Sequence, residues 1–171
     1  MEEKRLKEIR LEDIQKSRIT AKILGVIGTI ILLSNFINIL SELSRPYIYV
    51  DGLLHYQIEL SKYDLFLQSL VVLNLASFLF LMSSAIIFFM NKDKWNLLAL
   101  SIAAIIVILV PLMFWNNYLQ LFVSVVSDGY IYIRGDTYRL FIAYSSVLCA
   151  FPAIISTTGS LYGSSFNIKF E

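Results

Sequence analysis

Four long apolar segments divide this chain, and none of them contains an Asp, Glu, Lys, Arg or His residue. They cover about residues 23–40, 65–90, 97–115 and 140–162. A helix that crosses a bilayer needs about 20 consecutive, mostly apolar residues. The pattern therefore predicts an all-α membrane protein built as a bundle of four transmembrane helices.

Two stretches between these segments have a different pattern, "YIYVDGLLHYQIEL" at 47–60 and "SVVSDGYIYIRGD" at 124–136. Each has β-favouring residues on both sides of an Asp-Gly pair, which suits a two-residue type I′ turn. A turn at Asp51-Gly52 places Tyr47 opposite Tyr56. Apolar and polar residues also alternate after this turn, as in a half-buried strand. Each stretch is predicted to form a β-hairpin.

Both hairpins fall in loops on the same side of the predicted membrane, 41–64 and 116–139. An isolated hairpin is marginally stable in water, so we expect the two to share a small outward antiparallel sheet of four strands. The alternative is that the helices extend past the bilayer and the loops are irregular. One face of the sheet should carry Tyr47, Tyr49, Leu54, Tyr56 and Ile58. The second hairpin can complete it with either of two sets, Val123, Val125, Tyr130 and Tyr132 or Val126, Ile131 and Ile133.

An outward sheet carried by four spanning helices resembles the layout of the claudin family in topology. The first-loop signature of that family includes Trp residues and a pair of cysteines, and residues 41–64 contain neither Trp nor Cys. The resemblance therefore covers the layout alone, and no function is carried over from it.

The Lys and Arg residues predict the orientation. Ten of the fourteen precede the first span, lie between spans two and three, or follow span four. Positively charged loops stay in the cytoplasm, so both termini should be cytoplasmic and the protein should be a multi-pass protein of the plasma membrane. Residues 1–18 alternate in charge and are predicted to form a cytoplasmic helix. Residues 19–171 then form a single four-span membrane domain.

Small residues recur on single faces of the predicted helices. In the fourth span they are spaced alternately by four and three residues from Ser145 onward. Small side chains let helix backbones approach closely in lipid, where packing replaces the hydrophobic drive. A narrow polar pore or a pocket is the alternative for the fourth span. The predicted helix-packing residues are Gly25, Gly28, Ser77, Ser84, Ser145, Cys149, Ser156 and Gly159.

Candidate chemistry is sparse. The chain has one Cys and one His, so neither an internal disulfide nor a Cys-pair metal motif is possible. Acidic residues and His55 in the loops show no spacing diagnostic of a metal site. We expect no catalytic residue, no metal and no cofactor. A net charge of +1 gives no reason to expect nucleic acid as a partner. The tripeptide Arg134-Gly135-Asp136 matches an adhesion motif, but three residues occur often by chance.

These features favour a non-catalytic membrane protein that acts as an accessory or scaffolding subunit of a membrane assembly, or as a self-associating surface protein. Its expected partners are the lipid bilayer and other membrane subunits or itself. The alternative is a pore, or a small membrane subunit of a quinone-linked redox complex. The predicted outward interaction surface comprises Tyr47, Tyr49, Tyr56, Tyr130 and Tyr132.

Overall fold

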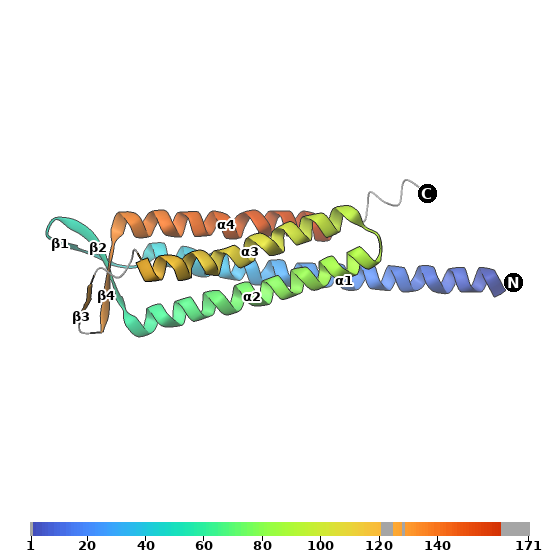
Figure 1. Ribbon diagram of the computed structural model, residues 1–171, viewed down its shortest axis with the longest axis horizontal. Helices are drawn as coiled ribbons and strands as arrows, with labels where there is room; N and C mark the ends of the chain where they lie inside the picture. Colours follow the sequence, from blue (N-terminus) through green and yellow to red (C-terminus); the bar gives the residue numbers. More distant parts are fainter. Residues whose placement is uncertain (1, 121–124, 128, 162–171) are drawn as a thin grey trace.

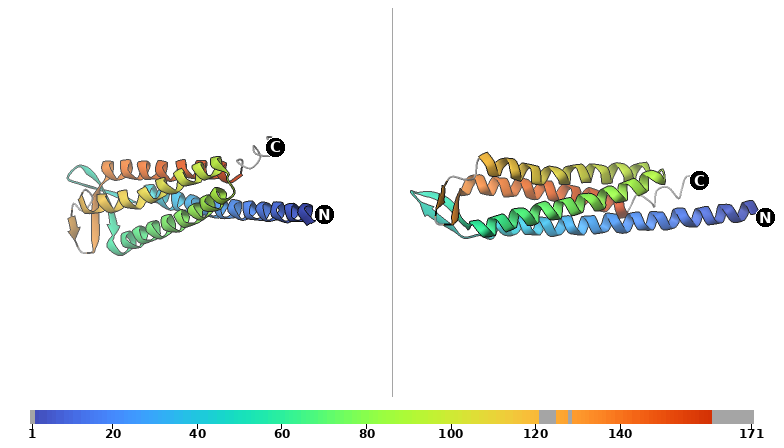
Figure 2. Two further views of the ribbon diagram at one scale, coloured as in Figure 1. Left: turned by 45° about the vertical axis from the view of Figure 1, so that its right-hand side comes forward. Right: turned by 60° about the horizontal axis from the view of Figure 1, so that its bottom comes forward.

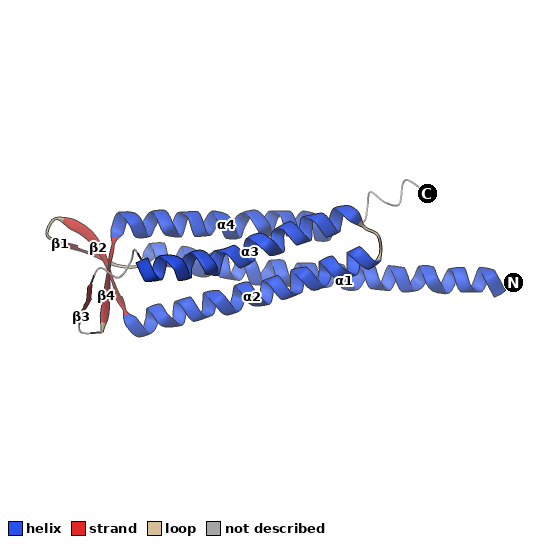
Figure 3. Cartoon of the chain, viewed as in Figure 1, coloured by secondary structure: helices blue, strands red, loops and turns tan. Residues whose placement is uncertain are grey.

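The computed structural model describes residues 2–120, 125–127 and 129–161. Helices dominate, and a small antiparallel sheet accompanies them (Figure 3). In chain order, the elements of this described part are α1 (Glu2–Ser41), the 3-10 helix η1 (Glu42–Ser44), β1 (Tyr47–Val50), β2 (Leu53–Glu59), α2 (Leu60–Met90), α3 (Lys94–Gln120), β3 (Val125–Ser127), β4 (Tyr130–Arg134) and α4 (Gly135–Leu161).

The helices lie side by side as a bundle, and the strands gather at one end of it (Figure 1). Each helix contacts its two neighbours in the ring α1, α2, α3, α4. We call the end with the strands the sheet end and the opposite end the far end. At the far end, the first part of α1 extends beyond the other helices (Figure 2). The charged residues 2–18 and the first apolar segment thus belong to one continuous helix, α1.

Three of the helices within the described residues are long and apolar enough to cross a membrane, namely α1, α2 and α4. In α3, the apolar stretch is shorter and covers Trp95–Leu109. Large apolar side chains cover the outside of the bundle. Ile37 is 66% exposed, Leu65 66% and Val147 64%. Small and polar residues are buried instead, among them Ser77 and Ser156. The helices are therefore apolar on the surface that faces away from their neighbours.

The predicted first hairpin and its turn are confirmed. Asp51 and Gly52 both have positive φ, 51° and 76°, as a type I′ turn requires. Tyr47 pairs with Tyr56 across the strands. The full order is β1-β2-β4-β3, and every pairing is antiparallel. The two hairpins thus join through their second strands, β2 and β4.

The pairing of β2 with β4 decides which residues of the second hairpin share the face of Tyr56. Tyr56 lies opposite Ile133, and Ile58 lies opposite Ile131. Val126 lies opposite Ile131 in turn. Of the two predicted sets, the register selects Val126, Ile131 and Ile133. The other set contains Val123, which lies outside the described residues.

Candidate functional site

A buried ion pair lies at the sheet end, where α1 gives way to η1. Glu42 is 3% exposed. Arg45 donates to both of its carboxylate oxygens, from Nε to Oε2 and, at 2.6 Å, from Nη2 to Oε1. Burial lowers the pKa of Arg45. The hydrogen bonds to Glu42 and the negative charge of Glu42 outweigh this effect, so the pKa of Arg45 is raised. The chain that enters β1 is thus fixed to the end of α1.

A residue of α4, far along the sequence, forms a hydrogen bond with this ion pair. The hydroxyl of Tyr138 donates a 2.6 Å hydrogen bond to Glu42 Oε2, and Tyr138 is 1% exposed. Its ring lies 5.0 Å from the ring of Tyr56 on β2, centroid to centroid. Glu42, Tyr138 and Tyr56 therefore connect η1, which directly follows α1, with α4 and the sheet.

Arg139, the next residue of α4, contacts two tyrosines of the sheet. Its Nε donates a 2.8 Å hydrogen bond to the hydroxyl of Tyr56. Its guanidinium carbon also lies 5.8 Å from the ring centroid of Tyr47, within the range of a cation–π interaction. At the start of α4, Gly135 packs so closely under Leu54 that an added Cβ would collide with that side chain. The inner face of the sheet is therefore fixed to the bundle at several points.

The edge strand β1 contrasts with this fixed region. Tyr47 is 50% exposed, Tyr49 72% and Val50 40%, and Leu53 across the turn is 47% exposed. No residue of β1 is charged. Natural edge strands usually carry charges, prolines or covering segments that prevent pairing with another chain. An exposed apolar edge on a fixed support is typical of a protein-binding surface. We define this surface, Tyr47–Val50 together with Leu53, as the β1 edge.

The five predicted surface tyrosines do not form one surface. Tyr56 is fully buried because it lies in the middle of the sheet, under Arg139 and against Tyr138, so its assignment to the surface was wrong. Tyr47 and Tyr49 share its face but lie on the edge strand, beyond the bundle. Tyr130 and Tyr132 lie on the opposite face, because Tyr132 pairs with Gln57.

All the predicted helix-packing residues are buried between helices. On α2, Ser84 Oγ donates to Ala21 O of α1 at 2.6 Å, and Ser77 Oγ donates to Gly28 O at 2.8 Å. The buried positions are Gly25, Gly28, Ser77, Ser84, Ser145, Cys149, Ser156 and Gly159.

The contact between α1 and α4 is equally close. The hydroxyls of Thr29 and Ser156 share a hydrogen bond of 2.7 Å. A Cβ added at Gly25 would collide with Ser160 Oγ, and one at Gly159 would approach Ala99 of α3 to 2.9 Å. The small residues at these positions let the helix backbones approach closely.

Two asparagines in the interior have polar atoms that lack hydrogen-bond partners among the described residues. Both amide atoms of Asn35 are unpartnered, as is Oδ1 of Asn74, and both side chains are 0% exposed. Along α1 and α2, the contact of Ser77 with Gly28 lies on one side of the two asparagines, and the contact of Asn38 with Ser69 lies on the other side. The two amides therefore lie at neighbouring levels of the bundle. Buried amides without partners are costly.

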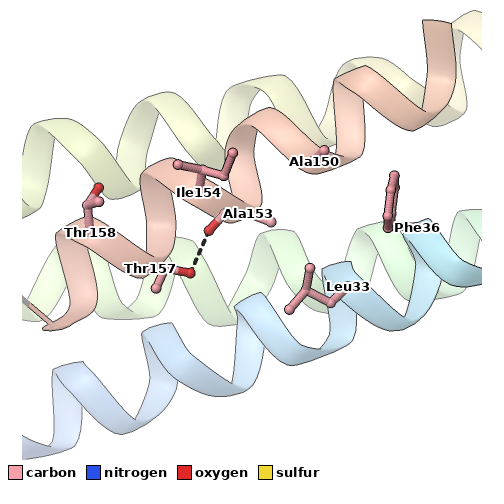
Figure 4. Close-up of a pocket in the computed structure, with 7 residues that line it drawn as sticks. All are labelled: Leu33, Phe36, Ala150, Ala153, Ile154, Thr157 and Thr158. Atoms are coloured by element: carbon pink, nitrogen blue, oxygen red, sulfur yellow. Dashed lines mark hydrogen bonds between the residues drawn. The ribbon is translucent and has the colours of Figure 1, made fainter. Parts of the chain in front are cut away.

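A groove of about 290 Å³ runs between α1 and α4 on the outside of the bundle (Figure 4). Both hydroxyls of its lining donate within α4, Thr157 Oγ1 to Ala153 O at 2.7 Å and Thr158 Oγ1 to Ile155 O at 2.8 Å. The lining is therefore effectively apolar. It consists of Leu33, Phe36, Ala150, Ala153, Ile154, Thr157 and Thr158.

At the far end, the turn between α2 and α3 contains a buried carboxyl group. Asp93 is 1% exposed. Burial raises its pKa, although the charges of Arg18 and Lys22 and the backbone N–H of Asn96 act in the opposite direction. Among the described residues, no three His, Cys, Asp or Glu side chains are grouped as metal ligands.

The sequence interpretation missed Glu42, Tyr138 and Arg139. A signal existed for the first of these, because Glu42 is an acidic residue placed directly after an apolar span. Tyr138 lies 96 positions after Glu42, and Arg139 lies 83 positions after its partner Tyr56, so no local pattern connects these residues. No protein-family model matches the chain, and neither a curated protein nor a solved structure matches it.

Proposed function

We propose that this chain is a four-span protein of the plasma membrane, with the sheet outside the cell and both termini in the cytoplasm. The apolar outer surface of the bundle supports this arrangement, since such a surface is unfavourable in water. α3 supports a fourth crossing, because it is 27 residues long and packs between α2 and α4. Its exposed side chains Ile105 and Leu112 are apolar.

The basic residues give the orientation of this proposal. The far end contains the N-terminal part of α1 and the turn with Lys92, and positive charge favours the cytoplasmic side. Single cysteines at Ser61 and Lys92, in a Cys149→Ala background, test it with an impermeant maleimide on intact cells. Ser61→Cys should react and Lys92→Cys should react only after lysis. The reverse pattern would overturn the orientation.

The function we assign is that of a non-catalytic interaction protein. The bundle acts as an anchor, and the β1 edge binds another membrane protein or a second copy of this chain. The observation that supports this function is the contrast between the fixed inner face of the sheet and the exposed, uncharged β1 edge. A sheet needed only for its own stability gains nothing from leaving Tyr49 72% exposed.

Photo-crosslinking in native membranes tests this function. A benzophenone amino acid replaces Tyr49, and the matched control replaces Tyr144 of α4, which is 65% exposed and would face lipid. Position 49 should form a discrete protein–protein adduct, and position 144 should not. Absence of any protein adduct at position 49 contradicts the proposal.

The unpartnered amides of Asn35 and Asn74 favour one alternative, a polar path through the bundle. Hydrated pores are lined by polar groups, whereas a purely structural interior has no use for unpaired amides. Ion flux into liposomes that contain the purified protein tests this alternative. It predicts a flux that Asn35→Leu abolishes and that Asn38→Leu, at the partly buried neighbouring position, preserves. Liposomes that stay impermeable would exclude it.

A further inference from the structure

The groove between α1 and α4 lies between two helices that are each long and apolar enough to cross a membrane. Its lining residues fall inside the apolar segments 23–40 and 140–162. Both threonine hydroxyls of the lining donate within α4, so the groove offers little to a polar ligand. Under the membrane arrangement proposed above, the groove opens into the hydrocarbon of the bilayer. An apolar chain therefore fits its lining.

The α1 side of the groove continues toward the far end along one helix face. Thr29 and Leu33 share this face, and the hydroxyl of Thr29 meets that of Ser156 of α4 in a 2.7 Å hydrogen bond. Lys22 lies seven positions before Thr29, and Arg18 lies four positions before Lys22. Side chains at steps of four and seven return to the same helix face. The groove and the two cations are therefore on one side of α1.

The two cations lie just past the end of α4. A Cβ added at Gly25 would collide with Ser160, and α4 ends one residue later, at Leu161. The next two turns of α1 toward the far end contain Lys22 and Arg18, and both side chains are partly exposed. The groove therefore leads from an apolar middle to a positively charged end.

The charges at this end of the groove favour an anion. Nε of Arg18 is buried and has no hydrogen-bond partner among the described residues. The ion pairs between described side chains involve neither Arg18 nor Lys22. Both cations act on Asp93, but burial raises the pKa of that carboxyl group. Asp93 thus opposes two positive charges with at most one negative charge, and an excess of positive charge remains.

The separation of the cations from the groove matches one leaflet of a bilayer. Leu33 follows Lys22 by 11 positions, which is a rise of about 17 Å along the helix axis. The hydrocarbon core of a bilayer is about 30 Å thick, so each leaflet contributes about half of it. A phospholipid whose phosphate lies at Lys22 would therefore place the end of its acyl chain beside Leu33.

The size of the groove argues against a second protein helix as its occupant. A helix with its side chains is about 10–12 Å across, and a stable protein interface buries about 1,200–2,000 Å². The groove has a volume of about 290 Å³ and is lined by seven residues. These dimensions suit a single hydrocarbon chain.

We propose that the groove binds one acyl chain of an anionic phospholipid of the cytoplasmic leaflet, and that Arg18 and Lys22 bind its phosphate group. The inference rests on the membrane arrangement of the proposed function and adds a lipid as a specific partner. Basic sites next to spanning helices on the cytoplasmic side suit anionic headgroups.

Native mass spectrometry tests the phosphate site. The protein is reconstituted in nanodiscs of phosphatidylcholine with a minority of phosphatidylglycerol, and the lipid that stays bound after release is identified. The wild type should retain one phosphatidylglycerol. The double variant Arg18→Gln, Lys22→Gln should bind it roughly thirtyfold more weakly, about fivefold for each cation removed.

A second double variant controls for the loss of two positive charges. Arg10→Gln, Lys16→Gln removes two exposed cations of α1 that lie farther from the groove. It should retain phosphatidylglycerol as the wild type does. Equal retention in both double variants, or no retained phosphatidylglycerol in the wild type, would overturn the proposal.

A photoreactive lipid tests the acyl-chain site. Phosphatidylglycerol with a diazirine in the lower half of one acyl chain should label the peptides that contain Leu33 and Ile154. Ala150→Phe fills the groove and should remove most of this labelling. Ile30→Phe, at a position of α1 that is 59% exposed, should leave the labelling unchanged. Labelling spread evenly over the outer faces of the helices would mean that lipid only surrounds the bundle, and this result contradicts the site.

The two proposals fail separately. If the wild type retains no phosphatidylglycerol while the photo-crosslinker at Tyr49 captures a protein, the lipid site is wrong and the interaction function stands. If the lipid is retained and position 49 forms no protein adduct, the lipid site stands and the interaction function is overturned. A benzophenone at Ile154 that captures a protein instead of lipid would show that a protein covers the groove, and the lipid site would again be wrong.

Discussion

Tyr138 donates a 2.6 Å hydrogen bond to Glu42, a buried carboxylate that lies 96 residues earlier in the chain. This contact joins the first turns of α4 to η1, the short helix that follows α1, next to Tyr56 of the sheet. Arg45 neutralises the carboxylate, and Tyr138 supplies one further hydrogen bond. A carboxylate 3% exposed depends on such partners, because burying a charge without them is very costly.

Tyr138→Phe should destabilise the protein by about 1.5–3 kcal/mol, the usual value of a hydrogen bond to a charged group. The ring and its contact with Tyr56 remain, so the loss reports the hydroxyl alone. Thermal unfolding in detergent measures it. The control is Tyr144→Phe on the exposed face of the same helix, which should leave the melting temperature unchanged. Equal melting temperatures for both variants would show that Glu42 does not need this bond.

Gly25→Ala should lower stability because the added Cβ meets Ser160 Oγ. That hydroxyl has no hydrogen-bond partner among the described residues, so Ser160→Ala alone should cost little. The double variant should recover part of the loss, since residues in contact are energetically coupled by about 0.5–3 kcal/mol. A double-mutant cycle of melting temperatures checks this coupling. Strictly additive effects would mean that α1 and α4 do not meet at these residues.

Asp93→Asn should change how stability depends on pH. The folded-state pKa of Asp93 is raised, so folding favours the protonated carboxyl. Its stabilising contribution is present below the unfolded value, about 3.9, and is lost as pH rises through the folded pKa. The amide of Asn stays neutral and also caps helices well. The variant should therefore melt higher than the wild type at pH 7, and the difference should vanish below about pH 4. The exposed Asp13→Asn serves as the control, and a pH-independent difference contradicts this explanation.

Gly52→Val should weaken the first hairpin because a β-branched residue resists positive φ. Gly52→Ala should be milder, at about 1–2 kcal/mol for a left-handed non-glycine residue. No atom lies within 4 Å of a Cβ built at this position, so the effect comes from the backbone alone. Protease cleavage at the hairpin measures it. Cleavage of Gly52→Val at the wild-type rate would show that the turn does not limit the hairpin.

The sequence alone predicted the local structure well, because short-range rules control it. Uncharged apolar runs predicted helices of membrane-spanning length. The Asp51-Gly52 pair predicted a type I′ turn and, with it, the register of Tyr47 and Tyr56. Period-two alternation identified β2. Steps of three and four residues identified the buried side of α4, because that spacing returns side chains to one helix face. Each of these signals lies within one element or one turn.

Only the tertiary structure decided how these elements meet. The alternation of the second hairpin allowed two inward faces, and the pairing of Tyr56 with Ile133 selected one of them. Tyr56 is buried and Tyr49 exposed although both lie on one face, because burial depends on distance from the bundle end and not on strand period. Glu42, Tyr138 and Arg139 became a cluster only when α1 and α4 were packed side by side. Contacts between distant residues depend on packing geometry, which no local pattern of side chains encodes.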